Sequence, residues 1–334
     1  MHNIYLNMQT SIGFVALNNA GYSLDLSGAT LTGITSLENT FKEKTIVTAN
    51  FLGTKLNNCS SYKNMFYKCA KLTTVKFSPI SEQNIVCESM FSDCYSLANF
   101  IWTDGTNNWD TSNVTNMKRM FYNCCFNGDG NQTTARSINI ECFNFNNVIT
   151  MQEMFSCSNN NIATKDLLNG IVLPKGNNAF AANATSVRAM FKYRVNTKSI
   201  ENLGYFKVDI VKLTAGVAAD GNNGGAGDLF YQFGAATLDL RSFDFNSVRK
   251  SDVIFNMFKN NKAIVTIYVA QGTDSSQIDT SNRTIFTGCN NIRGGSGTTF
   301  KGADAKYARV DGGPNSSTPG YFTYDPNLPP LEGA

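Results

Sequence analysis

The stretch WDTSNVTNMKRMFYNCCF, residues 109–126, carries a regular apolar stripe in a chain that is otherwise crowded with Asn, Gly, Ser and Thr. Apolar residues recur in it at steps of three and four, at Val114, Met117, Met120, Phe121 and Cys124. This spacing places apolar side chains on one face of a helix, and the Ser-Asn pair before the stripe could cap its first turn. By itself the stretch predicts a short amphipathic helix with a buried face.

The Met-Phe pair of this stretch recurs along the chain. Clear copies, whose side chains we expect to form the repeat core, are Met65-Phe66, Met90-Phe91, Met120-Phe121, Met154-Phe155 and Met190-Phe191. Degenerate copies are Thr40-Phe41, Leu229-Phe230, Ile254-Phe255 and Ile285-Phe286. Successive Phe residues are 25 to 39 positions apart, which fits a leucine-rich solenoid unit expanded by insertions. Units of this size bury their apolar faces only by stacking on one another, which predicts one elongated solenoid.

A short strand-like run follows most copies, as in KLTTVKF at 71–77. Because Leu72, Val75 and Phe77 are expected to point inward, the residues between them face outward. In parallel coils such residues form a continuous strip, and we expect any partner to bind there. The predicted binding face comprises Thr74, Lys76, Asn99, Ile101, Asn139, Asp239, Arg241, Thr266 and Tyr268. Arg241 and Tyr268 are expected to contribute most, since Arg and aromatic residues dominate interface energetics.

The predicted fold is an α/β solenoid, a right-handed leucine-rich-repeat-like coil with short parallel strands on one face and short helices on the other. Residues 1–30 are expected to cap its N-terminal end, and residues 31–290 to form about nine units with inserted loops in the middle. Residues 291–323 are expected to form a C-terminal cap, and residues 324–334 an extended tail. We expect no domain boundary inside the solenoid.

Composition limits the function. The formal charge of +3 and the lack of a Lys/Arg run argue against nucleic acid as a partner. No apolar run is long enough to span a bilayer, and the first residues do not resemble a secretory signal. The only histidine is His2, and the chain offers no paired-carboxylate spacing and no nucleophile elbow. We therefore predict no enzyme activity, no catalytic or metal site, no cofactor and no membrane insertion, and the sequence predicts no oligomeric state.

The nine cysteines allow three interpretations. Cys69, Cys94, Cys124 and Cys289 each follow the Met or Ile of a repeat pair by four residues, so stacked coils would align them. The first interpretation is a ladder of small buried side chains. Disulfides between neighbouring coils are the second, because the coil spacing is within reach of disulfide geometry. A metal site is the third, although the chain has no CxxC pair.

The segment DTSNVTNMKRMFYNC at 110–124 and the ending at 285–323 resemble the BspA-like leucine-rich repeat surface proteins, also described as the mycoplasma-type DUF285 repeat. Weaker copies extend over roughly residues 20–290. The resemblance implies a cell-surface or extracellular bacterial protein that adheres to a host protein, cell surface or glycan, with no catalytic residues. Such repeats also occur in bacteriophage genomes, so a virion fibre or receptor-binding component is the alternative.

Overall fold

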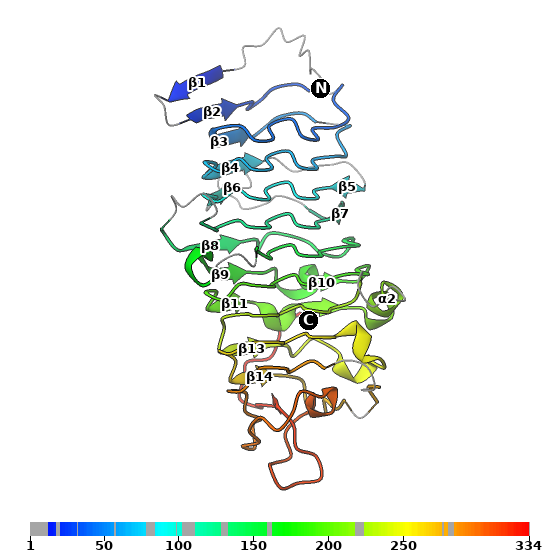
Figure 1. The fold of residues 1–334 in the computed structure, drawn as a ribbon. Helices are drawn as coiled ribbons and strands as arrows, with labels where there is room; N and C mark the ends of the chain where they lie inside the picture. Colours follow the sequence, from blue (N-terminus) through cyan, green and yellow to red (C-terminus); the bar gives the residue numbers. More distant parts are fainter. Residues whose placement is uncertain are drawn as a thin grey trace.

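The computed structural model describes residues 13–17, 21–31, 33–56, 58–77, 84–97, 99–101, 111–127, 133–158, 162–217, 224–275, 277–279 and 284–333. Within these ranges the chain is a parallel β-solenoid, an elongated stack of coils in which each coil adds one short strand to a common face (Figure 1). The prediction of a solenoid with parallel strands on one face is confirmed.

The strands are short. They are β1 (Gly13–Leu17), β2 (Gly21–Asp25), β3 (Ile46–Phe51), β4 (Thr74–Phe77), β5 (Ile85–Val86), β6 (Asn99–Ile101), β7 (Val114–Asn116), β8 (Arg136–Asn139), β9 (Leu168–Val172), β10 (Phe180–Ala181), β11 (Ser199–Glu201), β12 (Lys207–Val208), β13 (Thr237–Asp239), β14 (Thr266–Tyr268) and β15 (Phe322–Thr323). The α-helices are α1 (Ile162–Lys165) and α2 (Ile210–Ala215). The 3-10 helices are η1 (Gly176–Ala179), η2 (Leu203–Tyr205), η3 (Phe245–Ser247), η4 (Ser251–Val253) and η5 (Ala305–Tyr307).

The main face of the solenoid consists of three sheets in succession along the stack (Figure 1). Their strand orders are β1-β2-β3-β4-β6, β8-β9-β11 and β13-β14-β15. All pairs are parallel except β1 with β2, which is an antiparallel hairpin at the N-terminal end. Among the described residues, the main face therefore ends on its N-terminal side in a hairpin rather than in another coil.

A second parallel ladder runs along another side of the stack. It starts with single bridges that join Ser36 to Ser61 and Ser61 to Val86, and it passes through β5 and β7. Further single bridges then join Asn116 to Thr150, Thr150 to Ser186 and Ser186 to Gly225. Each coil thus contacts the next through the main face and again through this second ladder. A groove lies along this second ladder.

The Met-Phe segments are turns, and the prediction of a helix in each repeat is wrong. In the segment around Met65, the N–H groups of Asn64, Phe66 and Lys68 each donate to a carbonyl of the next coil over 2.9 Å. The intervening N–H groups donate three residues back within their own turn, for example Met65 to Tyr62 over 3.1 Å. An α-helix would use all of these donors internally. A run of turns also places the apolar side chains on one side. It leaves every second backbone N–H group to donate to the next coil.

Left-handed backbone conformations mark these turns. Asn64 has φ of 53° and Lys68 has φ of 59°, and the equivalent Arg119 and Asn123 have φ of 54° and 55°. Positive φ is uncommon for residues other than glycine, and a helix does not continue through it. Such a residue recurs every four positions, so these segments cannot form an uninterrupted α-helix.

One phenylalanine from each coil stacks on the next to form a continuous column inside the solenoid. Neighbouring rings lie 5.4 to 5.9 Å apart and within 17° of parallel. The members of this phenylalanine column are Phe41, Phe66, Phe91, Phe121, Phe155, Phe191, Phe230, Phe258 and Phe286. Stacked aromatic pairs contribute about 0.5–1.5 kcal/mol each beyond their burial. The column is therefore a major part of the cohesion between coils.

The repeat register predicted for one coil is wrong by three residues. Phe258, not Phe255, stacks on Phe230 and Phe286. The 3-10 helix η4 at Ser251–Val253 adds the three residues that a gapless alignment with the other copies does not allow for. The ten Met and Phe side chains of the five clear copies are all fully buried.

The cysteines are present as thiols. All nine lie in described residues, and none is in a disulfide. Cys94 Sγ donates to the carbonyl of Phe66 over 3.1 Å, and Cys124 Sγ to that of Phe91 over 3.0 Å. Each of these two thiols thus donates to the phenylalanine carbonyl of the preceding coil. The structure favours the ladder of buried thiols over the disulfides between coils.

The C-terminal end of the column is closed by Tyr321, whose ring meets Phe286 edge-on at 88° with centroids 5.0 Å apart. The Tyr321 hydroxyl donates to the Gly302 carbonyl and accepts from the N–H groups of Lys301 and Gly302. A perpendicular ring with its hydroxyl fully engaged ends the parallel stacking. Beyond β15 the chain turns back along the stack, so that the C-terminus lies beside the middle coils (Figure 1).

Candidate functional site

The residues of the predicted binding face lie on the main face of the solenoid. Thr74 and Lys76 are half-buried on β4, while Val75 and Phe77 between and after them are buried. Thr74 pairs in register with Asn99, and Lys76 with Ile101, although the side chains of these two β6 residues lie outside the described part. Asn139, on β8, is exposed. The alternation along β4 is that of a strand with one buried side.

The second half of the predicted face is partly occupied. Asp239 pairs in register with Tyr268. The guanidinium of Arg241 binds the Asp239 carboxylate through Nε and Nη2, over 2.9 and 2.8 Å, and donates from Nη1 to the carbonyl of Pro329 over 2.6 Å. The side-chain hydrogen bond from Asp239 raises the pKa of Arg241 above its ordinary value. Because the C-terminal segment already lies on Arg241, this residue is less available to a partner than its position in the sequence indicates.

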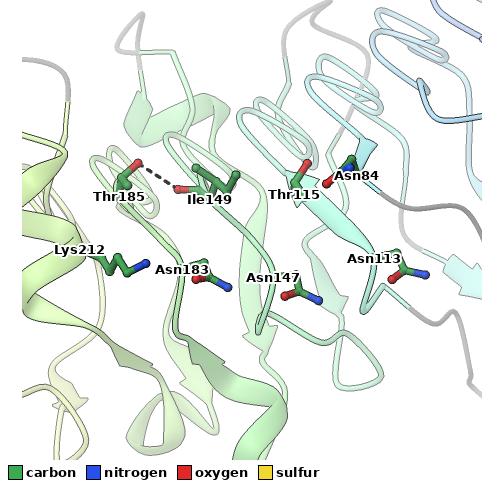
Figure 2. A pocket seen from close by; sticks show the side chains of 8 residues that line it. All are labelled: Asn84, Asn113, Thr115, Asn147, Ile149, Asn183, Thr185 and Lys212. Carbon is green, nitrogen blue, oxygen red and sulfur yellow. Dashed lines mark hydrogen bonds between the residues drawn. The ribbon is translucent and has the colours of Figure 1, made fainter.

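A groove of about 440 Å³ runs along the second ladder, on a side that the sequence analysis did not single out. We call it the asparagine groove, and its lining residues are Asn84, Asn113, Thr115, Asn147, Ile149, Asn183, Thr185 and Lys212. Figure 2 shows Asn113, Asn147 and Asn183 in one row with their amides oriented alike, beside a second row of Thr115, Ile149 and Thr185. Its volume falls within the range of about 300–1,000 Å³ that is typical of ligand sites.

Bonds between coils hold the amides of the groove in place. Asn147 Nδ2 donates to the Ser112 carbonyl over 2.7 Å, and Asn183 Nδ2 donates to the Asn146 carbonyl over 3.0 Å. An asparagine amide has two N–H donors and two acceptor positions on its oxygen, so each of these side chains keeps further capacity for hydrogen bonding. The groove is therefore a row of amides whose orientation is fixed before any ligand binds.

The second row is joined in the same manner. The N–H of Ile149 donates to the Thr115 carbonyl over 2.7 Å, and the N–H of Thr185 donates to the Ile149 carbonyl over 2.8 Å. The side chain of Ile149 is 48% exposed, so the groove has an apolar patch between two hydroxyls. One wall of the groove is therefore a row of amides, and the other combines two threonines with an apolar patch.

Helix α2 closes one end of the groove and supplies its charge. Asp209 caps the helix by accepting from the N–H groups of Val211 and Lys212. At the other end of the helix, a Cβ on Gly216 would lie 2.0 Å from the Thr185 carbonyl oxygen, so only glycine permits this approach. Lys212 is exposed and is the only charged side chain among the eight that line the groove (Figure 2). Within the described part of the chain it makes no ion pair.

The groove could have been found from the sequence. In the aligned copies, Asn113 and Asn147 directly precede Val114 and Val148, and Asn183 directly precedes the equivalent Ala184. The apolar positions of these copies indicate the core, and the asparagines directly before them indicate the groove. Lys212 had no such signal, because α2 lies in a segment that the other coils lack.

The described ranges contain neither a metal-binding cluster nor a membrane-spanning helix. These ranges contain no cluster of three or more His, Cys, Asp or Glu side chains arranged to hold a metal ion. None of the helices in them is both long and apolar enough to cross a bilayer. Residues 102–110, 128–132 and 218–223, which include parts of the predicted inserted loops, lie outside the described residues.

A family model described as "Mycoplasma protein of unknown function, DUF285" matches residues 35–167 and 85–209. The two matches overlap and together span residues 35–209, which is more than half of the chain. No curated protein and no solved structure matches the sequence.

Proposed function

The chain belongs to the DUF285 family, and from that premise we propose that it is a non-enzymatic binding protein that engages an extended partner along one side of its solenoid. The observation that carries this proposal is the asparagine groove, in which coil after coil presents the same residue type in the same orientation. A ligand that contacts several coils at once gains affinity from many modest contacts.

The interior of the protein supports this function. The phenylalanine column and the backbone bonds between coils fix the distance from each asparagine to the next. A binding surface on a rigid scaffold loses little conformational entropy when its partner binds. The resemblance to BspA-like leucine-rich repeat surface proteins adds the proposal that the partner is a host protein, a cell surface or a glycan and that the protein acts outside the cell.

The asparagine groove is a better-supported site than the main face. On the main face Arg241 is bound to Asp239 and to the C-terminal segment, whereas Ile149 and Lys212 in the groove are exposed. We therefore place the principal contact in the groove and treat the main face as a second surface to be tested beside it.

The experiment is a screen of immobilised glycans and extracellular host proteins with three forms of the protein. The first is the wild type, the second carries Ile149→Asp in the groove, and the third carries Lys76→Ala, Arg241→Ala and Tyr268→Ala on the main face. Unchanged circular dichroism of both variants is the control for folding. We expect a partner that the wild type and the main-face variant bind and that Ile149→Asp does not. Absence of binding to every glycan and protein would overturn the proposal. Loss of binding in the main-face variant alone would show that the partner binds the main face and not the groove.

A further inference from the structure

We propose that the asparagine groove binds an extended acidic oligosaccharide, with one sugar on each successive coil and a carboxylate or sulfate group at Lys212. This inference rests on the proposed function and adds the ligand class. It is drawn from the chemistry of the lining, from the spacing of the coils and from the charge of Lys212, with which no carboxylate of the described residues pairs.

The lining matches hydroxyl-rich ligands. Asn113, Asn147 and Asn183 each present an amide, which can donate to one hydroxyl group of a sugar and accept from its neighbour. On the opposite row, the hydroxyls of Thr115 and Thr185 donate to the carbonyls of Ile85 and Ile149 over 3.3 Å, and each can accept from a sugar hydroxyl. Between these hydroxyls, the exposed side chain of Ile149 offers an apolar surface for the C–H face of a pyranose ring.

The spacing of the groove matches a polymer. Neighbouring strands in a sheet are about 4.7–4.9 Å apart, and each asparagine lies on a separate coil of the second ladder. This distance is comparable to the advance of one sugar along an extended β-linked chain. A chain lying along the row therefore meets an equivalent amide at each sugar.

An extended peptide fits the groove less well. A peptide usually gains affinity by pairing its backbone with an open strand edge. In the groove these backbone groups are already used, since the carbonyls of Asn113, Thr115 and Ile149 each accept an N–H from the neighbouring coil. The amides of Asn147 and Asn183 each have a second N–H, and the threonine hydroxyls that already donate to carbonyls can still accept. These groups favour a ligand that is itself rich in hydroxyls.

Lys212 specifies the charge of the ligand. Its ammonium group lies in line with the asparagine row in Figure 2. Since no carboxylate in the described residues pairs with it, an acidic group on the ligand would supply the missing partner. Such an exposed ion pair is screened by salt, so binding is expected to weaken as the ionic strength rises.

The test is calorimetric titration of the full chain with hyaluronan fragments from disaccharide to octasaccharide, and with neutral N-acetylglucosamine oligomers of matched length. We expect affinity for hyaluronan to rise with length and to level off once the row of asparagines is covered. We expect Ile149→Asp and Asn147→Ala to weaken this binding at least tenfold. Lys212→Ala should weaken binding of hyaluronan while leaving the neutral oligomers unaffected. The matched control is Asn291→Ala. Asn291 is an exposed asparagine outside both the groove and the main face, and its Nδ2 also donates to a carbonyl of another coil, that of Lys262 over 2.7 Å, so the variant should bind as the wild type does.

Three results would overturn the inference. The first is absence of binding to every acidic oligomer, and the second is an affinity independent of oligomer length. The third is oligosaccharide binding that survives both Ile149→Asp and Asn147→Ala in folded protein. If the screen described above finds a protein partner lost with Ile149→Asp while hyaluronan does not bind, the groove is a peptide site. In that case the proposed function stands and the ligand class is wrong.

Discussion

Arg194 and Asp166 form an ion pair, Nη1 to Oδ1 over 2.9 Å, in which both side chains are fully buried. Arg194 stands three residues after Phe191, the position that Cys124 occupies after Phe121. Like that thiol, its Nε donates to the phenylalanine carbonyl of the preceding coil, that of Phe155. In this coil the Arg194 guanidinium thus makes the bond to the phenylalanine carbonyl that a cysteine thiol makes elsewhere. Its greater length also lets it contact Asp166, in the segment before β9.

This ion pair is expected to be essential for stability. Asp166 also accepts from the N–H groups of Leu168 and Asn196, so its oxygens are fully engaged. Removing one partner of a buried pair leaves an uncompensated charge and costs about 3–5 kcal/mol. We expect Arg194→Met to lower the free energy of unfolding in urea by that amount. Arg194→Met combined with Asp166→Asn should be less destabilised than Arg194→Met alone, and the opposite order would contradict this account.

The phenylalanine column predicts a large difference between neighbouring residues of one turn. Phe121 is fully buried between Phe91 and Phe155, whereas Tyr122 beside it is half-buried on the outside. Phe121→Ala should cost about 3–5 kcal/mol, as is usual for a large core side chain. Phe121→Asp should abolish folding. Tyr122→Ala is the matched control, and thermal melting that treats Phe121→Ala and Tyr122→Ala alike would refute the importance of the column.

The buried thiols predict how the protein responds to alkali. Burial raises the pKa of Cys69 from 9.0 to about 11 and that of Cys289 to about 12. A group whose pKa is raised in the folded state stabilises the fold below its unfolded pKa and loses that contribution as pH rises toward its folded value. Stability should therefore decline between about pH 9 and 12. Denaturation curves across this range check the prediction, and Cys69→Ala should reduce the slope.

The same burial predicts slow thiol chemistry in the native state. A thiolate is the reactive form of cysteine, and eight of the nine side chains are buried, with Cys142 the exception. We expect an aromatic disulfide reagent at neutral pH to modify at most Cys142 in the folded protein. After denaturation without reductant it should modify all nine cysteines. Recovery of only a few thiols after denaturation would indicate disulfides and contradict the structure.

Asp311 predicts the response to acid. Burial by itself would raise the pKa of the Asp311 carboxyl, but hydrogen bonds from Thr298, Gly313 and Gly320 lower it below 3.8. A group with a lowered pKa stabilises the fold above its unfolded pKa and loses that contribution as pH falls toward its folded value. We expect Asp311→Asn to destabilise the C-terminal end at neutral pH and to differ less from the wild type at pH below 3.8. Hydrogen exchange of residues 296–322 at the two pH values is the measurement.

The repeat and the buried positions were determined by the sequence. The recurring Met-Phe pair, with its apolar neighbours, predicted a solenoid because units of that size cannot bury their apolar faces alone. The same pattern predicted which residues lie inside, and Met120, Phe121 and Cys124 are indeed fully buried. The parallel strands on one face followed from the alternation in runs such as 71–77.

The conformation of the Met-Phe segments was decided only by the tertiary structure. Apolar residues at steps of three and four fit a helix and a run of turns equally well, because both place those side chains on one side. The choice depends on where the N–H groups of residues such as Asn64 and Phe66 find acceptors. Those acceptors lie on the next coil, some 25 residues away in sequence, and only the stacked chain brings them within reach. The asparagine groove has the same origin, since Asn113, Asn147 and Asn183 become neighbours only when the coils are stacked.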